Sequence, residues 1–422
     1  MPPDSHPSLT EATRFWLKLG LISFGGPAGQ IAIMHTELVE KRRWISEERF
    51  LHALNFCMLL PGPEAQQLAT YIGWLLHGTR GGIVAGVLFV LPAAFMLWAL
   101  SWLSLAGGNI PWVAAIFYGL QPAVMAIVAA AVLRIGEKAL KTPFLWCLAA
   151  LSFVAIFFFK ISFVFIILAA AGMALLAARL RPGFLPATKA AQSGDESHPR
   201  VPVTKTLKTS LVCIMLWIAP IILAGLAFGW TSIFVQQGIF FSKAALVTFG
   251  GAYAVLPYVA QQAVENYGWL STTQMMSGLA LAETTPGPLI LVLQFVGFAG
   301  AWQHPGSLPP LLAGTLGAAI TTWVTFTPSF LFILAGAPHM ERLRHVRALT
   351  AALSGITAAV VGVILNLAVW FGIHAFFPSP GKPDYFIIVL SVVFFVGLWK
   401  GRWGVVPVVM AGGLLGLIAR PW

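Results

Sequence analysis

Residues 57–67 read CMLLPGPEAQQ, and residues 282–292 read AETTPGPLILV. Each segment places two prolines around one glycine inside otherwise apolar sequence. A proline lacks the backbone N–H that an α-helix uses, so two of them cannot both lie in an unbroken helix. Both segments therefore predict interrupted helices. The two segments are 225 residues apart, so that Pro61 in the first corresponds to Pro286 in the second.

The composition indicates the class of protein that contains these breaks. The chain has 422 residues, of which 58% are hydrophobic and only 9% charged, whereas soluble domains carry about 25% charged residues. This deficit excludes disorder, a disulfide scaffold and an ordinary cytosolic enzyme. A membrane crossing needs about 20 apolar residues, so roughly ten to thirteen membrane elements fit. We expect an all-α polytopic membrane protein.

Other residues recur at the same spacing of 225, which predicts an internal duplication. Lys18, Phe24, Gly25, Gly26, Trp44 and Ser46 recur as Lys243, Phe249, Gly250, Gly251, Trp269 and Ser271. Further along, Pro92 corresponds to Pro328 at an offset of 236. We expect a first repeat at 1–180, a polar cytoplasmic linker at 181–206, a connector transmembrane helix at 207–229 and a second repeat at 239–422.

The distribution of basic residues predicts that the two repeats have opposite orientations. Short loops rich in Lys and Arg stay in the cytoplasm. The 41–49 loop is rich in both, and its counterpart 265–271 has neither. One loop later the bias reverses, because 106–110 has no basic residue and 337–348 has several. Inverted repeats whose broken or re-entrant helices meet near the midplane are typical of secondary transporters.

The breaks themselves predict an anion site. A proline just after a break is well placed as the first residue of a new helix, which leaves the N–H groups behind it free. Free N–H groups at the positive end of a helix bind anions without any side-chain charge. The alternative is a set of proline kinks with glycines for close packing. The predicted site comprises Phe24, Gly25, Gly26, Pro27, Pro61, Gly62, Pro63, Gly250, Gly251, Thr284, Thr285, Pro286, Gly287 and Pro288.

Few charges lie within the apolar segments, and charges inside a membrane are functional by default. Lys18 and Lys243 each precede a Phe-Gly-Gly break by six residues. They could balance a bound anion, or extend to the membrane interface. Neutral donors near the breaks suit an oxyanion but could equally satisfy freed backbone; these are Gln30, Gln66, Gln67 and Gln294.

Two carboxylates, Glu64 and Glu283, adjoin the proline-containing breaks. An ionised carboxylate repels an anion, and burial favours its protonated form. Anion and proton binding would then be coupled through Glu64 or Glu283. The alternative for each is a charge at a helix N-terminus that faces water.

Nothing in the sequence predicts a metal site, a cofactor, a nucleic-acid partner or an enzyme. Cys57, Cys147 and Cys213 are far apart and form no CxxC motif, so we expect small buried thiols. No HExxH motif and no GxxxxGK[ST] motif occurs, which argues against metallohydrolase and ATP-driven chemistry. The partners that remain are an anion, a proton and the lipid bilayer.

The chain resembles the chromate ion transporter family in its long two-domain form. The resemblance rests on FWLKLGLISFGGPAGQIAIMH at 15–35, PGPEAQQL at 61–68, FSKAALVTFGGAYAVLPYV at 241–259 and ETTPGPLILVLQFVGFAGAW at 283–302. It implies a multi-pass inner-membrane antiporter that exports chromate, confers chromate resistance, has sulfate as a structural mimic and is driven by the proton motive force. The second Phe-Gly-Gly is followed by Ala252 where the first is followed by Pro27.

Several alternatives remain open at this point. A carrier or importer for sulfate or another anion fits the same residues, and so does a passive anion channel. Two complete repeats in one chain can build a site without a partner, so both a monomer and a homodimer are compatible with the sequence.

Overall fold

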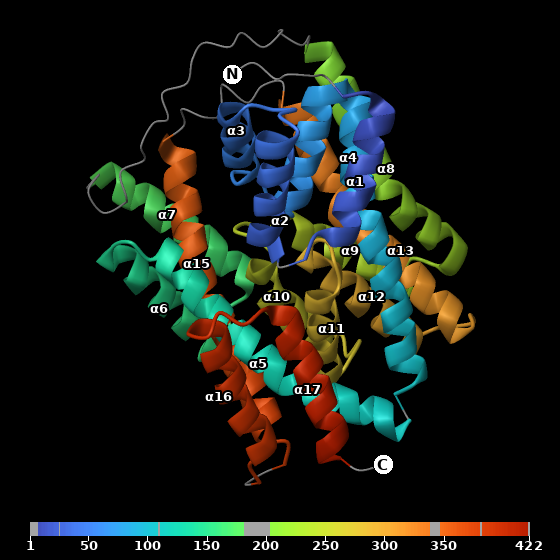
Figure 1. Ribbon diagram of the computed structural model, residues 1–422, viewed down its shortest axis with the longest axis vertical. Helices are drawn as coiled ribbons and strands as arrows, with labels where there is room; N and C mark the ends of the chain where they lie inside the picture. The colour runs from blue at the N-terminus through green and yellow to red at the C-terminus, as the bar shows by residue number, and fades with distance from the viewer. Residues whose placement is uncertain are drawn as a thin grey trace.

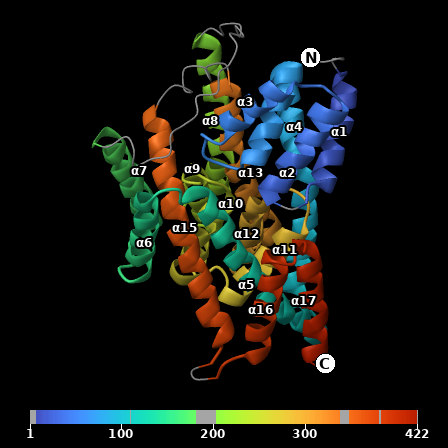
Figure 2. The same cartoon turned by 60° about the vertical axis from the view of Figure 1, so that its left-hand side comes forward.

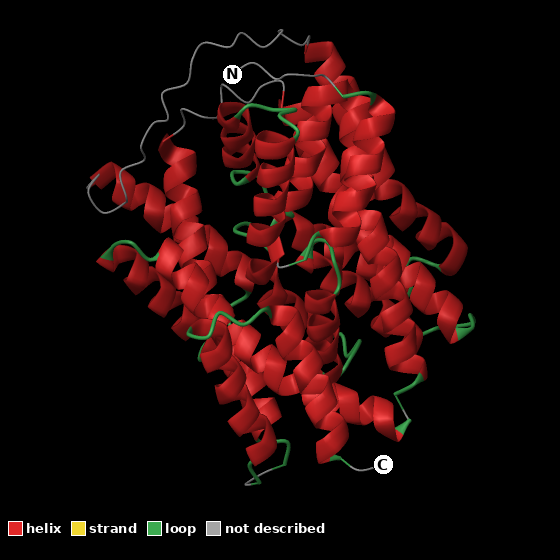
Figure 3. Cartoon of the chain, viewed as in Figure 1, coloured by secondary structure: helices red, strands yellow, loops and turns green. Residues whose placement is uncertain are grey.

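The computed structural model describes residues 7–24, 26–108, 110–180, 203–337, 347–379 and 382–420. Within them the chain is helical and forms no β-strand (Figure 3). Six helices are long and apolar enough to cross a membrane, and five shorter apolar helices accompany them. The expectation of an all-α polytopic membrane protein is confirmed.

The first part of the chain forms seven α-helices and one π-helical turn (Figure 1). In order they are α1 (Leu9–Ile22), α2 (Gly26–His35), η1 (Thr36–Lys41), α3 (Glu47–Cys57), α4 (Glu64–Ala106), α5 (Pro111–Ala139), α6 (Pro143–Phe157) and α7 (Phe163–Leu180).

After α8 (Val203–Phe228) a similar order of elements follows. These are α9 (Ile233–Leu246), α10 (Ala252–Gln261), the π-helical turn η3 (Gln262–Asn266), α11 (Thr272–Thr284), the 3-10 turn η4 (Leu289–Leu291), α12 (Val292–Gln303), α13 (Pro310–Gly336), α15 (Arg347–Phe376), α16 (Tyr385–Trp399) and α17 (Val405–Ala419).

The linker predicted at 181–206 lies mostly outside the described residues. Its last four residues belong to α8, which begins at Val203 rather than at 207. The predicted connector is therefore a longer helix than the sequence pattern indicated. It packs against α9 and α13, and its other faces expose large apolar side chains such as Leu223 and Leu226, as expected of a helix that borders lipid.

Special backbone conformations recur in both parts of the chain. Gly26 and Gly251 have positive φ values of 69° and 94°, and Gly62 and Gly287 have values of 122° and 96°. Only glycine adopts such conformations without strain. The Phe-Gly-Gly and Pro-Gly-Pro segments therefore break the helices, as the sequence predicts.

At two of the breaks the proline does not begin the new helix, although the sequence predicts that it does. Pro63 and Pro288 are the capping residues that precede the new helical turns, not their first helical residues. Only Pro27 lies inside the first turn of its helix. The reason is that the preceding glycines carry the sharp change of direction, so each proline still belongs to the extended segment.

Helix α4 consists of two arms that turn back at His77 and Gly78. Gly78 has a φ of 60°, and His77 also leaves the helical conformation. The arms meet through small residues: a Cβ on Gly82 would lie 3.0 Å from the carbonyl oxygen of Thr70. Small residues permit this close helix packing inside a membrane. Gly306, with a φ of 61°, lies at the corresponding turn between α12 and α13.

The terminal helices of the two parts are exchanged. Helix α5 packs against α16 and α17, whereas α15 packs against α6 and α7, and α5 and α15 pack against each other. Figure 2 shows α16 and α17 beside α5, and α6 and α7 beside α15. Backbone contacts at Gly119 with Gly412 and Gly416, and at Gly355 with Ala170, make these crossings close.

The second arm of α4 and α13 pack against each other in opposite directions. In Figure 1, α4 descends on the right-hand side, while α13 rises from the lower right toward the top. Opposite directions of corresponding helices are what inverted repeats require. The inversion of the complete repeats stays a prediction.

Replacing Gly62 by alanine should destabilise the fold. Its φ of 122° is unfavourable for any L-residue, and the new Cβ would lie 2.8 Å from both Gln67 Nε2 and Ser329 Oγ. We expect Gly62→Ala to lower the free energy of unfolding by about 1–3 kcal/mol. The measurement is thermal unfolding of the detergent-solubilised protein.

The matched control is Gly172→Ala in α7, where a Cβ meets nothing within 4 Å and the backbone is helical. This variant should be neutral or slightly stabilising, because alanine favours the helix. Equal unfolding temperatures for the two variants would contradict the role assigned to Gly62.

Candidate functional site

The four helix breaks meet in the interior, where they are joined by two backbone hydrogen bonds. Gly62 N donates to Thr248 O at 2.7 Å, and Gly287 N donates to Ser23 O at 2.8 Å. Both donors and both acceptors are related by the offset of 225. Each Pro-Gly-Pro segment is thus bonded to the Phe-Gly-Gly segment of the other part of the chain. We call this arrangement the crossing.

The helices that lead into the crossing end in the same way. Ser23 Oγ donates to Leu19 O at 2.6 Å, and Thr248 Oγ1 donates to Ala244 O at 2.6 Å. Both hydroxyls are fully buried. The Ser23 hydroxyl satisfies a carbonyl group at the end of α1, and the Thr248 hydroxyl adds a second donor to Ala244 O, which also accepts from Val247 N at 3.2 Å. The carbonyls of Ser23 and Thr248 themselves remain available to the crossing.

Glutamine side chains satisfy much of the remaining freed backbone. Gln30 Nε2 donates to Gly287 O at 2.5 Å and to Ser23 O at 3.2 Å. Gln67 Nε2 donates to Pro61 O at 2.7 Å, and Gln294 Nε2 donates to Ala94 O at 2.7 Å. Their amide donors therefore serve the backbone, which was one of the two readings of the sequence.

Several polar groups at the crossing lack a partner among the described residues. The amide oxygens of Gln30, Gln66 and Gln67 and the hydroxyl of Ser329 are buried without a hydrogen bond. The backbone N–H groups of Glu64, Ala65 and Gln66, in the first turn of α4, also have no acceptor within the described chain. Unsatisfied groups of this kind are rare in folded proteins and identify a place where a ligand or water binds.

The two sides of the crossing differ chemically. Gly62 faces Ser329 Oγ and Gln67 Nε2, whereas Gly287 faces the methyl group of Ala93. Ser329 and Ala93 are counterparts at the offset of 236. The sequence analysis did not identify Ser329, although it follows Pro328, whose match to Pro92 was the available indication.

The two predicted carboxylates have different surroundings. Glu64 is the first residue of α4 and is half-buried, without a hydrogen bond or ion pair to any described residue. Glu283 is only 8% exposed and accepts a short hydrogen bond from Tyr253 Oη of α10. Tyr253 was also missed from the sequence, where its counterpart is Ala28.

The basic residues near these carboxylates are not the predicted ones. Lys18 and Lys243 lie on exposed faces of α1 and α9, and neither pairs with a described residue of the crossing. The charge of Lys138 reaches Glu64, and the charge of Arg134 reaches Glu283. Both are exposed in the last turns of α5.

Other predicted site residues are placed less directly at the crossing. Phe24 is exposed, and Gly25 lies outside the described residues. Thr284 Oγ1 donates to Leu281 O at 2.9 Å, and Thr285 Oγ1 donates to Ala282 O at 3.0 Å. These hydroxyl protons serve α11 itself.

Loop 42–46 is joined to α1 by an ion pair and a cation–π contact of Arg42. Arg42 lies 3.6 Å from Glu11 and stacks over Phe15 and Trp44 at 5.1 and 4.9 Å. Nearby, the hydrogen bond from Lys41 lowers the pKa of Glu37, and the charges of Lys18 and Arg42 add to this effect. The described part of the second repeat contains no ion pair of this kind.

Corresponding helices differ in how deeply they are buried. Eight of the ten residues of α10 are buried, whereas only Gln30 and Met34 are buried in α2. Helix α10 packs against α15, and α11 packs against α5 and α17. No comparable packing joins α2 to α5, or α3 to α15, among the described residues. The side of the crossing formed by α2 and α3 is therefore the more open one.

Known proteins resemble the chain along its whole length. The chromate transporter family model matches residues 10–176 and again residues 235–417. A chromate transport protein of Pseudomonas aeruginosa is 34% identical over 100% of this chain and 94% of its own length. A chromate transport protein of Cupriavidus metallidurans is 29% identical over 98% of this chain and 94% of its own length.

A shorter relative matches only one part. The uncharacterized transporter YwrB of Bacillus subtilis is 32% identical over 36% of this chain and 77% of its own length. No solved structure matches the chain. The relatives with assigned roles are transport proteins, which agrees with the expectation that the chain is not an enzyme. With its membrane-length helices and two matches to one family model, the chain is a multi-pass membrane protein that belongs to the chromate transporter family.

Proposed function

We propose that this chain exports chromate across the inner membrane by alternating access, in exchange for protons. The observation that carries the proposal is the crossing, where four helix breaks meet and leave donors and acceptors without partners. The names of the relatives supply the substrate. The chemistry of the crossing supplies the reason why an oxyanion would bind there.

The first turn of α4 is the best anion site in the described chain. Three consecutive N–H groups, from Glu64 to Gln66, have no acceptor, and the helix dipole places partial positive charge at the same point. Gly62 has no side chain, so Gln67 Nε2 and Ser329 Oγ lie close to its backbone, and both groups can donate to an anion. A tetrahedral dianion such as chromate or sulfate fits donors of this kind, so sulfate remains the alternative substrate.

Proton coupling would use Glu64 and Glu283. In exchange transport the proton and the anion occupy the site in alternate steps, so Glu64 would be ionised while the anion is bound, with the charge of Lys138 offsetting the repulsion, and would be protonated in the return step. The unpartnered amide oxygens of Gln66 and Gln67 accept hydrogen bonds, so they suit a protonated carboxyl group or a hydrogen-bearing oxyanion. Glu283 already has a donor in Tyr253 and would hold its proton on the other side of the crossing.

Alternating access is supported by the unequal packing of corresponding helices. If the repeats are inverted, the state in which α10 and α11 are packed and α2 and α3 are loose has a counterpart with these roles exchanged. By the positive-inside rule, the loose side carries the basic 41–49 loop and faces the cytoplasm. The structure then corresponds to a cytoplasm-open state. A passive channel would not need the second state.

Proteoliposomes loaded with labelled chromate test transport and coupling. An acidic exterior should drive chromate out against its gradient, because protons move inward as the anion leaves. Replacing Glu64 and Glu283 by glutamine should abolish the response to the pH gradient, since glutamine carries no titratable proton.

Glu48→Gln is the matched control, because Glu48 is exposed in α3 and lies outside the crossing. If chromate flux through the unmodified protein does not respond to the pH gradient, proton coupling is excluded. Flux that never runs uphill would favour a channel, and faster flux of sulfate in competition would reverse the substrate assignment.

The hydrogen bond between Tyr253 and Glu283 gives a second prediction. Tyr253→Phe removes a donor to a buried carboxyl group, and a hydrogen bond to a charged group contributes about 1.5–3 kcal/mol. We expect proton-driven flux to fall by about tenfold or more, with an altered pH profile.

Tyr258→Phe is the control on the same helix. Tyr258 packs against Phe163 and Phe240, and its hydroxyl has no partner among the described residues. The Tyr258→Phe variant should leave the chromate flux and its pH profile unchanged. Equal losses in both variants would show that α10 tolerates no change, and would remove Tyr253 from the coupling scheme.

Cross-linking tests the exchange of packing. Pro257 and Asn366 line a common pocket between α10 and α15, and their counterparts are Ala32 of α2 and Ala130 of α5. In a cysteine-free background, the Pro257→Cys and Asn366→Cys pair should be joined by a short thiol cross-linker in the cytoplasm-open state. The Ala32→Cys and Ala130→Cys pair should be joined only in the opposite state.

The two pairs should therefore respond in opposite directions to an imposed pH gradient. The measurement is the cross-linked fraction on a denaturing gel after cutting the 181–206 linker at an introduced protease site. Parallel responses, or an Ala32–Ala130 pair that never forms, would contradict alternating access by this exchange.

A further inference from the structure

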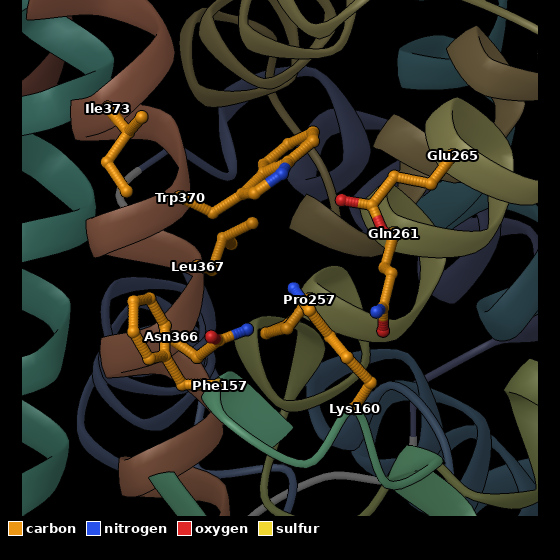
Figure 4. A pocket seen from close by; sticks show the side chains of 9 residues that line it. All are labelled: Phe157, Lys160, Pro257, Gln261, Glu265, Asn366, Leu367, Trp370 and Ile373. Carbon is orange, nitrogen blue, oxygen red and sulfur yellow. The ribbon is translucent and has the colours of Figure 1, made fainter. Parts of the chain in front are cut away.

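A pocket lies between α10 and α15, two helices that pack against each other in this structure. It is enclosed by α10 and η3, by α15 and by the turn between α6 and α7, and measures about 630 Å³ with the open solvent at its mouth included. Figure 4 shows its side chains, with Lys160, Gln261, Glu265, Asn366 and Trp370 supplying the polar and aromatic groups.

The polar groups of this pocket have no partners among the described residues. Lys160, Gln261, Glu265 and Asn366 make no hydrogen bond or ion pair there. In Figure 4 the ammonium group of Lys160 and the amide of Asn366 extend into the pocket, and the carboxylate of Glu265 projects from the opposite wall. Asn366 is partly buried inside the long apolar helix α15, where polar side chains typically face a water-filled or ligand-binding cavity.

Lys160 is held in place by its backbone. Its φ is 52° in the tight turn between α6 and α7, and Arg402 has the same φ in the corresponding turn between α16 and α17. A left-handed conformation is uncommon for a residue other than glycine, and persists when the surrounding structure fixes it. The direction of the Cα–Cβ bond of Lys160 is thus set by the fold.

The location of the pocket relates it to transport. Its walls, α10 and α15, are the pair that is packed in this state, and α2 and α5 are the corresponding loose pair. Gln261 and Trp370 correspond to Thr36 and Arg134 on the open side. If the packing were reversed, α2 and α5 would enclose a space that corresponds to this pocket.

We propose that this pocket is the port at which the oxyanion leaves the protein, with Lys160 and Asn366 as its binding residues and Glu265 as the group that weakens binding. The proposal rests on the proposed function, because it assigns a second position on the same anion pathway. Lys160 attracts the anion, Asn366 donates from its amide, and Glu265 repels the anion from the far wall.

A weak site is what a release port requires. An exporter takes up its substrate at low concentration inside and must let it go outside, so tight external binding would return the anion. One cation and one carboxylate leave the lining without net charge, while the amides of Asn366 and Gln261 still offer donors. Removing the charge of Lys160 should therefore weaken anion binding, and removing the charge of Glu265 should strengthen it.

The test measures external anion binding by protection of a cysteine. Ile373 lines the pocket and is exposed, so Ile373→Cys in a cysteine-free background accepts an impermeant sulfonate-bearing thiol reagent added outside. Molybdate, a tetrahedral dianion that does not oxidise thiols, is the probe, at constant ionic strength. We expect molybdate to slow labelling in a concentration-dependent way.

Charge variants then show opposite shifts. Lys160→Gln should raise the half-protecting molybdate concentration by about tenfold, since a unit charge several ångströms from a dianion in a wet site is worth about 1.4 kcal/mol. Glu265→Gln should lower it several-fold, and Asn366→Leu should raise it several-fold. Lys382→Gln is the control, because Lys382 is exposed in the loop between α15 and α16 and does not line the pocket.

The outcomes separate this proposal from the proposed function. Labelling that molybdate does not slow, in protein that still transports chromate, would overturn the port alone. Absence of chromate transport with protection intact would overturn the proposed function and leave an anion site. Labelling that depends on anionic lipid in the vesicle and not on molybdate would assign the pocket to a phospholipid headgroup, and would overturn the port as well.

Discussion

The arrangement depends on one constraint: a backbone break at membrane depth must find hydrogen-bond partners inside the protein. Four breaks meet here, and each Pro-Gly-Pro segment bonds to a Phe-Gly-Gly segment of the other part of the chain. Neither part could satisfy its breaks alone in this way. The exchange of α16 and α17 with α6 and α7 joins the two parts further, through helix packing.

The sequence predicted the breaks because their causes are local. Proline removes a donor and glycine permits a positive φ, and both effects are visible in single residues such as Pro61 and Gly62. The partners could not be predicted, since Ser329 and Tyr253 reach the crossing only through helix packing between distant segments. The exchange of terminal helices was missed for the same reason: apolar periodicity shows that a helix is buried but not which helix covers it.

The predicted role of Lys18 and Lys243 illustrates a limit of reading charge from sequence. Their repeat relationship indicated a shared function, yet both side chains are exposed on the outer helices α1 and α9. The basic residues whose charges reach the carboxylates, Arg134 and Lys138, were not among the predicted site residues. Both lie in the last turns of α5, which continues as a helix to Ala139.

Two kinds of asymmetry must be distinguished in this fold. The difference in burial between α2 and α10 concerns packing, and a transporter could reverse it in each cycle. The differences between Ser329 and Ala93, and between Tyr253 and Ala28, are fixed by sequence and persist in every state. A cycle built from exchangeable packing but unequal side chains has two faces with different affinities. The direction of net movement in any such cycle is set by the gradients across the membrane, so the inequality would determine how readily each face loads and releases an anion, not which way the cycle turns.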